Sequence, residues 1–133
     1  MRIMLDTNVI ISALLFPSIE MAALLESVLH EHTLVMASYV VEELLRVVDK
    51  KFPRHKAVVK TMLNEIYFEG IETPTHIPLD LGIRDMDDSP ILFTALIGSV
   101  DILITGDKDF TVIQNPPIEI LTPKQYIDRY VEQ

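Results

Sequence analysis

The sequence contains no cysteine and no tryptophan, and it has only four glycines among 133 residues. The absence of cysteine excludes disulfide bonds and thiolate ligands for a metal. No basic segment followed by an apolar one opens the chain, because Asp6 interrupts the first apolar run, so no secretory signal is expected. No apolar stretch approaches the roughly 20 residues that a membrane-spanning helix needs. We therefore expect a cytoplasmic protein that has no membrane partner.

Basic residues are the scarcer class of charged residue. Lysine and arginine number 11 against 20 aspartates and glutamates, which gives a formal net charge of −9. Taken alone, this balance argues against a nucleic-acid partner, because phosphate backbones attract basic surfaces. Six of the basic residues nevertheless fall within fifteen positions: Arg46, Lys50, Lys51, Arg54, Lys56 and Lys60. Two interpretations stay open, a solvated helix face and a surface that binds phosphates.

Apolar residues are abundant, at 49% of the chain, which is enough for the core of one domain. We predict a single domain over residues 1–133. Apolar strands predicted over residues 2–6, 32–38, 100–107 and 118–121 alternate with segments of helical periodicity. This alternation, with strands that are apolar on both faces, predicts an α/β fold. We expect three layers (α/β/α) around a central, mostly parallel sheet of four to five strands.

Capping residues predict where the helices begin. The expected starts are at Ser18, Ser38, Ser89–Pro90 and the Thr122–Gln125 capping box. Residues 54–70 predict an amphipathic helix with Gly70 just past its end. The side chains expected to face inward from it are those of Val58, Val59, Met62, Leu63 and Ile66. Residues 71–82 are expected to be extended and irregular.

Acidic residues stand where predicted strands end or where the next helices begin. Asp6 ends the first strand, and Asp107 follows the strand that contains the segment ILIT. In open α/β sheets, ligands bind just outside the carboxyl ends of the strands. The other acidic residues near this edge are Glu42, Glu43, Asp85, Asp87 and Asp88. Carboxylates gathered at one point repel one another, and a hard divalent cation such as Mg²⁺ or Mn²⁺ is the usual compensation.

Each carboxylate also has a purely structural interpretation. Asp6 and Asp88 can each cap the helix that follows. Asp107 can be a turn residue in the segment TGDKD. One of Glu42 and Glu43 is expected to be only a surface residue, and helical periodicity does not say which. The occurrence of all these acids near one edge favours a metal site, and such sites typically catalyse phosphoryl chemistry.

Four segments, in this order, resemble the PIN-domain family. They are LDTNVIISALL (5–15), LVMASYVVEELLRVV (34–48), RDMDDSPILFTAL (84–96) and ILITGDKDF (102–110). The resemblance extends over about residues 2–126. It implies a Mg²⁺- or Mn²⁺-dependent endoribonuclease, since many members are VapC-type toxins of toxin–antitoxin pairs. The partners that it implies are an RNA substrate, a cognate antitoxin protein and a second copy of the chain in a homodimer or higher homo-oligomer.

The same resemblance implies the residues of the site. The catalytic metal ligands would be Asp6, Glu43, Asp88 and Asp107, with Asp85 and Asp109 as possible substitutes or additions. Glu43 is preferred to Glu42 because the family's glutamate usually precedes an apolar residue. Asp88 is placed first because it lies closest to the helix start, although the choice among Asp85, Asp87 and Asp88 stays open. The polar residues implied around the ligands are Thr7, Asn8, Ser38 and Thr105.

With RNA as the implied substrate, the basic residues become candidate phosphate contacts. Arg84 and Lys108 lie nearer the acids in the sequence and would contact the scissile phosphate or pair with carboxylates. The full set of candidate RNA-binding residues is Lys50, Lys51, Arg54, Lys56, Lys60, Arg84 and Lys108.

Two alternatives to this function remain. One is a non-catalytic module that uses the PIN scaffold to bind RNA or a protein. The other is a phosphatase of the haloacid-dehalogenase type with Asp6 as a covalent nucleophile. Such an enzyme needs Asp-x-Asp after its first strand, and this chain has DTN there, so the second acid is missing.

Overall fold

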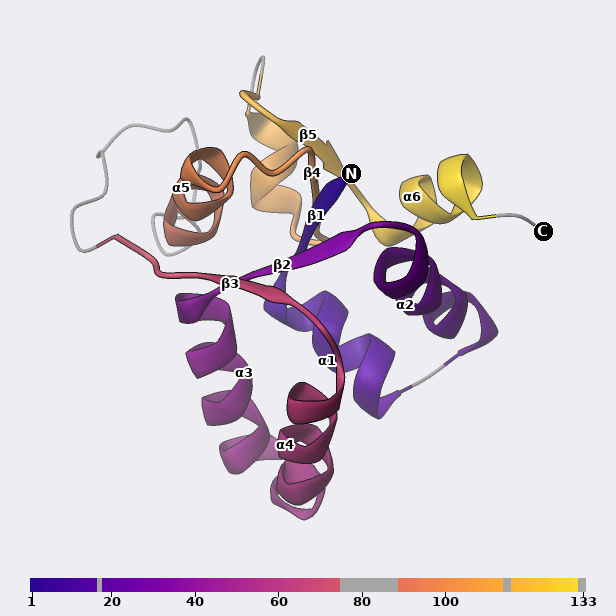
Figure 1. Ribbon diagram of the computed structural model, residues 1–133, viewed down its shortest axis with the longest axis vertical. Coiled ribbons are helices and arrows are strands. Elements are labelled where there is room, and N and C mark those ends of the chain that lie inside the picture. The colour runs from indigo at the N-terminus through magenta and orange to yellow at the C-terminus, as the bar shows by residue number, and fades with distance from the viewer. Residues whose placement is uncertain (17, 75–88, 114–115, 132–133) are drawn as a thin grey trace.

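The computed structural model describes residues 1–16, 18–74, 89–113 and 116–131. A five-stranded sheet forms its centre, and six α-helices flank the sheet (Figure 1). The strands are β1 (Arg2–Leu5), β2 (Thr33–Ala37), β3 (Glu69–Ile71), β4 (Ile102–Ile104) and β5 (Glu119–Leu121). The helices are α1 (Thr7–Leu15), α2 (Ile19–Glu31), α3 (Ser38–Lys51), α4 (Lys56–Glu65), α5 (Ser89–Ile97) and α6 (Pro123–Tyr130). Two short 3-10 helices, η1 (Pro53–His55) and η3 (Lys108–Val112), complete the described elements.

The sheet has the strand order β3-β2-β1-β4-β5, and every described pairing is parallel. The first strand therefore lies at the centre, where Ile3 is opposite both Leu34 of β2 and Ile102 of β4. Figure 1 shows α1, α3 and α4 on one side of the sheet and α5 on the other, so the three-layer α/β/α prediction is confirmed. Because all strands are parallel, their carboxyl ends meet at a single edge.

Strands buried on both faces explain the continuous apolar runs of the sequence. Ile3, Met4 and Leu5 are fully buried, as are Leu103 and Ile104 in the neighbouring β4. Covering helices leave no solvated face on these strands, so no alternation of polar and apolar residues is required. The chain thus places its most apolar strands directly beneath the edge where the acids lie.

Strand β3 was not predicted, and the structure corrects the expected helix around it. Helix α4 ends at Glu65 rather than near Gly70, and Gly70 instead lies in β3, opposite Met36 of β2. The strand has only three residues, two of them exposed, so it lacks a detectable apolar pattern. The prediction that Val58 faces inward was also wrong, because Val58 is 51% exposed whereas Val59 is fully buried.

The expected caps are confirmed at Ser18 and Thr122. The Ser18 hydroxyl accepts a hydrogen bond from the backbone N–H of Met21, and both bonds of the Thr122–Gln125 capping box are present. The prediction for Ser38 was wrong. Helix α3 begins at Ser38 itself, directly after β2, so no residue of a connecting loop is available to cap it.

The Ser38 side chain has a different partner. Its hydroxyl accepts a hydrogen bond from the backbone N–H of Thr73 (2.9 Å), and the Thr73 hydroxyl accepts one from the backbone N–H of Tyr39 (3.1 Å). The Thr94 hydroxyl of α5 also lies 3.3 Å from the Thr73 hydroxyl. These contacts join the start of α3 to the segment after β3 and to α5.

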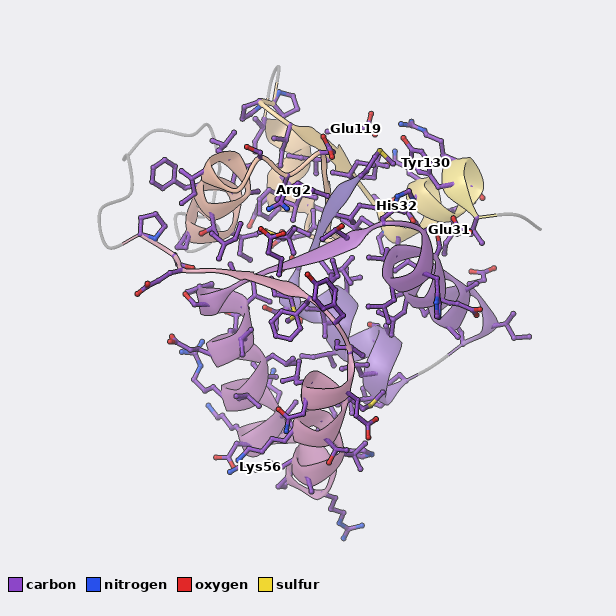
Figure 2. The ribbon with its side chains drawn as sticks, in the orientation of Figure 1. Arg2, Glu31, His32, Lys56, Glu119 and Tyr130 are labelled. Carbon is purple, nitrogen blue, oxygen red and sulfur yellow. The ribbon has the colours of Figure 1, made fainter. Side chains whose placement is uncertain are left out.

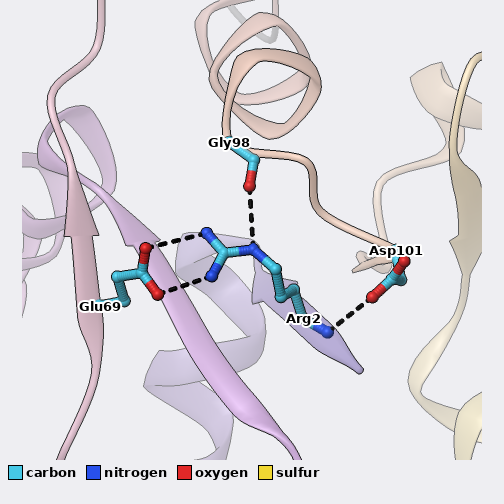
Figure 3. A network of polar contacts seen from close by, with 4 residues as sticks. All are labelled: Arg2, Glu69, Gly98 and Asp101. Atoms are coloured by element: carbon cyan, nitrogen blue, oxygen red, sulfur yellow. Dashed lines mark hydrogen bonds and ion pairs between the residues drawn. The ribbon is translucent and has the colours of Figure 1, made fainter.

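At the amino ends of the strands, Arg2 connects three elements (Figure 3). Its guanidinium donates two hydrogen bonds to the Glu69 carboxylate of β3 and one to the backbone carbonyl of Gly98. The backbone N–H of Arg2 donates to the Asp101 carboxylate, just before β4. The hydrogen bond from Arg2 lowers the pKa of Glu69. This network lies at the opposite edge of the sheet from Asp6, so its role is structural.

Helix α6 returns across the molecule to pack on α2. The hydroxyl groups of Ser27 and Tyr126 are 2.8 Å apart in a buried contact. The rings of His32 and Tyr130 lie 6.5 Å apart in an edge-to-face arrangement (Figure 2). Within the described residues, no single helix has the length and hydropathy to cross a membrane; α1 and α2 reach them only when counted together across a 115° bend.

Candidate active site

Asp6 is a buried carboxylate at the point where β1 becomes α1. Its backbone N–H still donates to the Ile104 carbonyl of β4, so the residue is fixed by the sheet. One carboxylate oxygen accepts from the backbone N–H of Thr7 (2.7 Å), and the other accepts from the Thr105 hydroxyl (2.7 Å). The capping interpretation of Asp6 is therefore correct in part. Asp6 also has a second partner, Thr105, which directly follows the neighbouring strand β4.

Burial raises the pKa of Asp6, which is only 6% exposed to solvent. The hydrogen bonds from Thr105 and Thr7 act in the opposite direction, because they stabilise the charged carboxylate. The negative charges of Glu43 and Asp107 raise the pKa further. The carboxylates of Glu43 on α3 and of Asp107 after β4 thus each lie within electrostatic range of Asp6.

Glu43 approaches this site from α3. The Tyr39 hydroxyl, one helical turn earlier, donates to its carboxylate at 3.3 Å, and an Arg46 nitrogen lies 3.7 Å from the same oxygen. The neighbouring Glu42 is exposed and lines a different cavity of about 470 Å³, which Phe68 and residues of β3 also line. Glu43 is therefore the member of this pair whose charge reaches Asp6.

Asp107 lies three residues after the end of β4 and caps the start of η3. Its backbone N–H donates to the Thr105 hydroxyl at 3.0 Å, and its carboxylate accepts from the backbone N–H of Asp109 at 2.9 Å. The turn interpretation of Asp107 is thus correct as well. The Thr105 hydroxyl accepts a hydrogen bond from the Asp107 backbone and donates one to the Asp6 carboxylate, so it fixes the position of Asp107 relative to Asp6.

The remaining predicted residues are placed unevenly. Asn8 is exposed on the first turn of α1, and Thr7 is buried with a hydroxyl that has no hydrogen-bond partner among the described residues. Ser38 is engaged with Thr73 rather than with a carboxylate. Four predicted or candidate residues lie outside the described residues: Arg84, Asp85, Asp87 and Asp88. The contact from Tyr39 to Glu43 was missed, although its spacing of four residues in a helix could have revealed it.

The chemistry of the donors fits a hard divalent cation. Carboxylate and hydroxyl oxygens are the ligands that Mg²⁺ and Mn²⁺ prefer, and buried like charges without a cation raise one another's pKa. The buried Thr7 hydroxyl, which has no hydrogen-bond partner within the described part of the chain, adds a further oxygen on the residue that follows Asp6. Among the residues that the structure describes, however, no three aspartate, glutamate, histidine or cysteine side chains converge closely enough to hold a metal as they stand.

The predicted RNA-binding residues lie mainly at the far end of α3 and on η1 and α4. Lys56 pairs with Asp49 at 2.8 Å, and this contact lowers the pKa of Asp49 (Figure 2). The side chains of Lys50, Lys51, Arg54 and Lys60 are exposed. Lys108 is exposed at the start of η3, close in sequence to Asp107. The basic cluster therefore does not surround the carboxylates, but it continues along the same helix that carries Glu43.

Comparisons with known proteins identify a family and a shared fold. A family model described as "PIN domain" matches residues 2–109. The fold is similar to that of VapBC2 from Rickettsia felis bound to a DNA fragment from their promoter, with a TM-score of 0.71 and 21% identity. It is also similar to that of FitAcB from Neisseria gonorrhoeae, with a TM-score of 0.61 and 20% identity. Each alignment covers 92% of this chain and 98% of the other. No curated protein matches the sequence.

Proposed function

Since this chain belongs to the PIN-domain family, we propose that it is a metal-dependent endoribonuclease that hydrolyses RNA phosphodiester bonds as the toxin of a toxin–antitoxin pair. The observation that carries the proposal is the environment of Asp6. This buried carboxylate is oriented by Thr105 and lies within electrostatic range of Glu43 and Asp107. A purely structural cap would need neither the second hydrogen bond nor the neighbouring charges.

The proposed metal ligands are Asp6, Glu43, Asp88 and Asp107, with Asp85 and Asp109 as possible additions. A bound Mg²⁺ or Mn²⁺ ion would supply Lewis-acid polarisation of the phosphate and would compensate the gathered negative charge. The Thr105 hydroxyl orients Asp6 by donating a hydrogen bond to its carboxylate. The same hydroxyl positions Asp107 by accepting a hydrogen bond from the backbone N–H of Asp107. Because the Glu43 side chain is partly accessible to solvent, we assign it the role of the general base that accepts a proton from the attacking water.

A cleavage assay tests the proposal. The wild-type protein is expected to cleave single-stranded RNA with Mn²⁺ or Mg²⁺ and to stop when a chelator is added. Asp6→Asn is expected to lower the rate by about a hundredfold or more, because the ligand charge is removed while the shape is kept. Circular dichroism checks that the variant is folded. Full metal-dependent activity of this variant would exclude the mechanism.

The non-catalytic module remains the second candidate function. It is favoured by the absence, within the described part of the chain, of a preformed group of three metal-binding side chains. Calorimetry with Mn²⁺ alone separates the two functions when it is run beside the cleavage assay. Metal binding without cleavage of any RNA would support the module, whereas metal-dependent cleavage supports the nuclease.

An antitoxin and a second copy of the chain are the protein partners that we propose. The similar structure of VapBC2 supports a partner of the antitoxin kind, and this role would place the protein in the cytoplasm. Ile19, at 91% exposure on the first residue of α2, is a candidate dimer contact together with the half-buried Met21 and Met62. Sedimentation of the wild type and of Ile19→Glu would test the dimer. An unchanged oligomeric state would remove Ile19 from the interface.

A further inference from the structure

Three rings meet where α1 and α3 end, away from the sheet. The rings of Phe16 and Phe52 lie 5.3 Å apart in an edge-to-face arrangement, and those of Phe52 and His55 lie 6.5 Å apart. We call Phe16, Phe52 and His55 the aromatic tip. Phe16 is 56% exposed and His55 is also exposed, whereas Phe52, which contacts both rings, is half-buried. Single exposed apolar side chains are ordinary, but two exposed rings held by a third ring form a surface on which a planar group can stack.

Cations flank the residues of the aromatic tip in the sequence. Lys50, Lys51 and Arg54 are exposed, and they form no ion pair within the described residues. By contrast, Lys56 is already engaged by Asp49 at 2.8 Å. In a chain with a net charge of −9, these three cations within five positions are a local concentration of positive charge in the sequence. Exposed rings beside available cations are the combination that binds single-stranded nucleic acid.

The aromatic tip is connected to the candidate active site by two parallel helices. Helix α1 begins after Asp6 and ends before Phe16, and α3 carries Glu43 in its first half and ends before Phe52. The contact between Phe16 and Phe52 joins the two helix ends, and Figure 1 shows the helices running in the same direction away from the sheet. One end of this helix pair therefore has the carboxylates and the other has the rings.

Polar and basic side chains follow the helices between these ends. On α3, Glu43, Arg46 and Lys50 are spaced by three and four residues, which places them on one face. On α1, the exposed Asn8 and half-buried Ser12 lie on the same face at a spacing of four. The nine residues of α1 span about 14 Å, which corresponds to about four stacked nucleotides.

We propose that α1 and α3 form a track for single-stranded RNA, which leads from the carboxylates past Arg46 and Lys50 to the aromatic tip. The cations contact phosphates, and an unpaired base about four nucleotides from the cleaved bond stacks on Phe16. The inference rests on the proposed function, because it takes the RNA substrate as the occupant. It adds that the RNA must be long enough to reach the rings and that Phe16 provides a stacking position for one of its bases.

RNA binding measured with a chelator present tests the track without requiring cleavage. Fluorescence anisotropy would compare labelled single strands of about three and about twelve nucleotides, since only the longer one reaches the tip. Phe16→Ala is expected to weaken binding of the longer strand about fivefold or more, because the base no longer stacks on a ring, and to leave the shorter one unchanged. Phe16→Leu keeps an apolar contact with Phe52 and should show the same weakening, which separates stacking from misfolding. The matched control is Tyr67→Ala, an aromatic that is 79% exposed elsewhere.

Charge reversal gives an independent measurement. Lys50→Glu combined with Arg54→Glu is expected to reduce the slope of log affinity against log salt by about 0.7 for each phosphate that the variant no longer neutralises. Lys124→Glu, an exposed lysine on α6, is the control and should change the slope less.

The outcomes distinguish the track from the proposed function. Equal affinity of the longer strand for the wild type and the Phe16 variants would overturn the track, and so would equal weakening on both strand lengths. A change of oligomeric state in Phe16→Ala without any change in RNA affinity would also overturn it, since a second copy of the chain would then cover the rings. If the wild type did not cleave RNA with Mn²⁺, the proposed nuclease function would be overturned. The binding measurements would still test the track, because they do not require cleavage.

Discussion

The hydroxyl group of Thr105 donates a 2.7 Å hydrogen bond to Asp6, although the two residues are 99 positions apart in the chain. The bond exists because β1 and β4 are neighbours in the parallel sheet, so their carboxyl ends lie side by side. The same hydroxyl accepts from the backbone N–H of Asp107. The orientation of two proposed metal ligands therefore depends on one side chain that is not itself acidic.

Replacing Thr105 by valine tests this dependence. Thr105→Val keeps the shape of the side chain but removes the donor to Asp6 and the acceptor for the Asp107 backbone. We expect the pKa of Asp6 to rise further, the acid limb of the cleavage rate to move to higher pH, and the free energy of unfolding to fall by about 1–3 kcal/mol. Thr105→Ser keeps the hydroxyl and serves as the control. An unchanged pH profile in the valine variant would show that the bond does not tune Asp6.

The raised pKa of Asp6 predicts how stability depends on pH in the metal-free protein. Between 3.8, the ordinary value for aspartate, and the higher value in the folded state, the folded protein holds a proton that the unfolded chain has released. The free energy of unfolding therefore falls as pH rises through this window. Below this window, Asp6 is neutral in both states, so its titration no longer changes the free energy of unfolding.

Asp6→Asn should consequently be more stable than the wild type at neutral pH when a chelator is present. The advantage should shrink as the pH is lowered toward 3.8, because the wild-type carboxylate then becomes neutral as well. Urea unfolding at several pH values measures both effects. An advantage that did not change with pH would mean that the substitution acts through packing or hydrogen bonding rather than through charge.

Glu43 and Glu42 provide a matched pair for testing metal binding. Glu43→Gln is expected to weaken Mn²⁺ affinity by more than about tenfold, because it removes a charge that reaches Asp6. Glu42→Gln changes an exposed residue that lines a separate cavity and should leave the affinity within about twofold of wild type. Isothermal titration calorimetry measures both. Similar losses of affinity in the two variants would remove the structural basis for choosing Glu43.

Gly98 is tightly packed at the end of α5, and this predicts a pair of compensating substitutions. A Cβ atom on Gly98 would overlap Cδ1 of Ile71 and would lie 3.1 Å from the Thr94 carbonyl oxygen. Gly98→Ala is therefore expected to lower the free energy of unfolding by about 1–3 kcal/mol. Ile71→Val removes the closest atom, so the double variant should recover part of this stability in denaturant unfolding. Strictly additive destabilisation would mean that the Thr94 carbonyl, and not Ile71, sets the cost.

The strong elements of the fold could be predicted from the sequence. The strands that became β1, β2 and β4 are continuous apolar runs, because helices cover both of their faces. Ser18 and Thr122 identified helix starts because their hydroxyls bond to the backbone N–H of the third residue on. These signals are local, so a single sequence carries them.

The errors arose where tertiary contacts override local patterns. Strand β3 exists because Glu69, Gly70 and Ile71 pair with β2, and a three-residue edge strand has too little apolar surface to reveal itself. Ser38 has the composition of an N-cap, yet its hydroxyl accepts from Thr73, which comes 35 residues later. Likewise, the choice between Glu42 and Glu43 required the position of α3 relative to Asp6, because both residues flank the apolar face of the helix.

The central position of β1 has a consequence for synthesis of the protein. Of the described strands, β1 is synthesised first. One of its edges stays unpaired until β4 (Ile102–Ile104) has been made. A nascent chain that stops before Thr105 therefore has the first acid without the side chain that orients it. If the protein is a toxin, a ribosome that releases such a fragment produces an inactive one, because the proposed catalytic geometry is assembled only after Thr105 has been made.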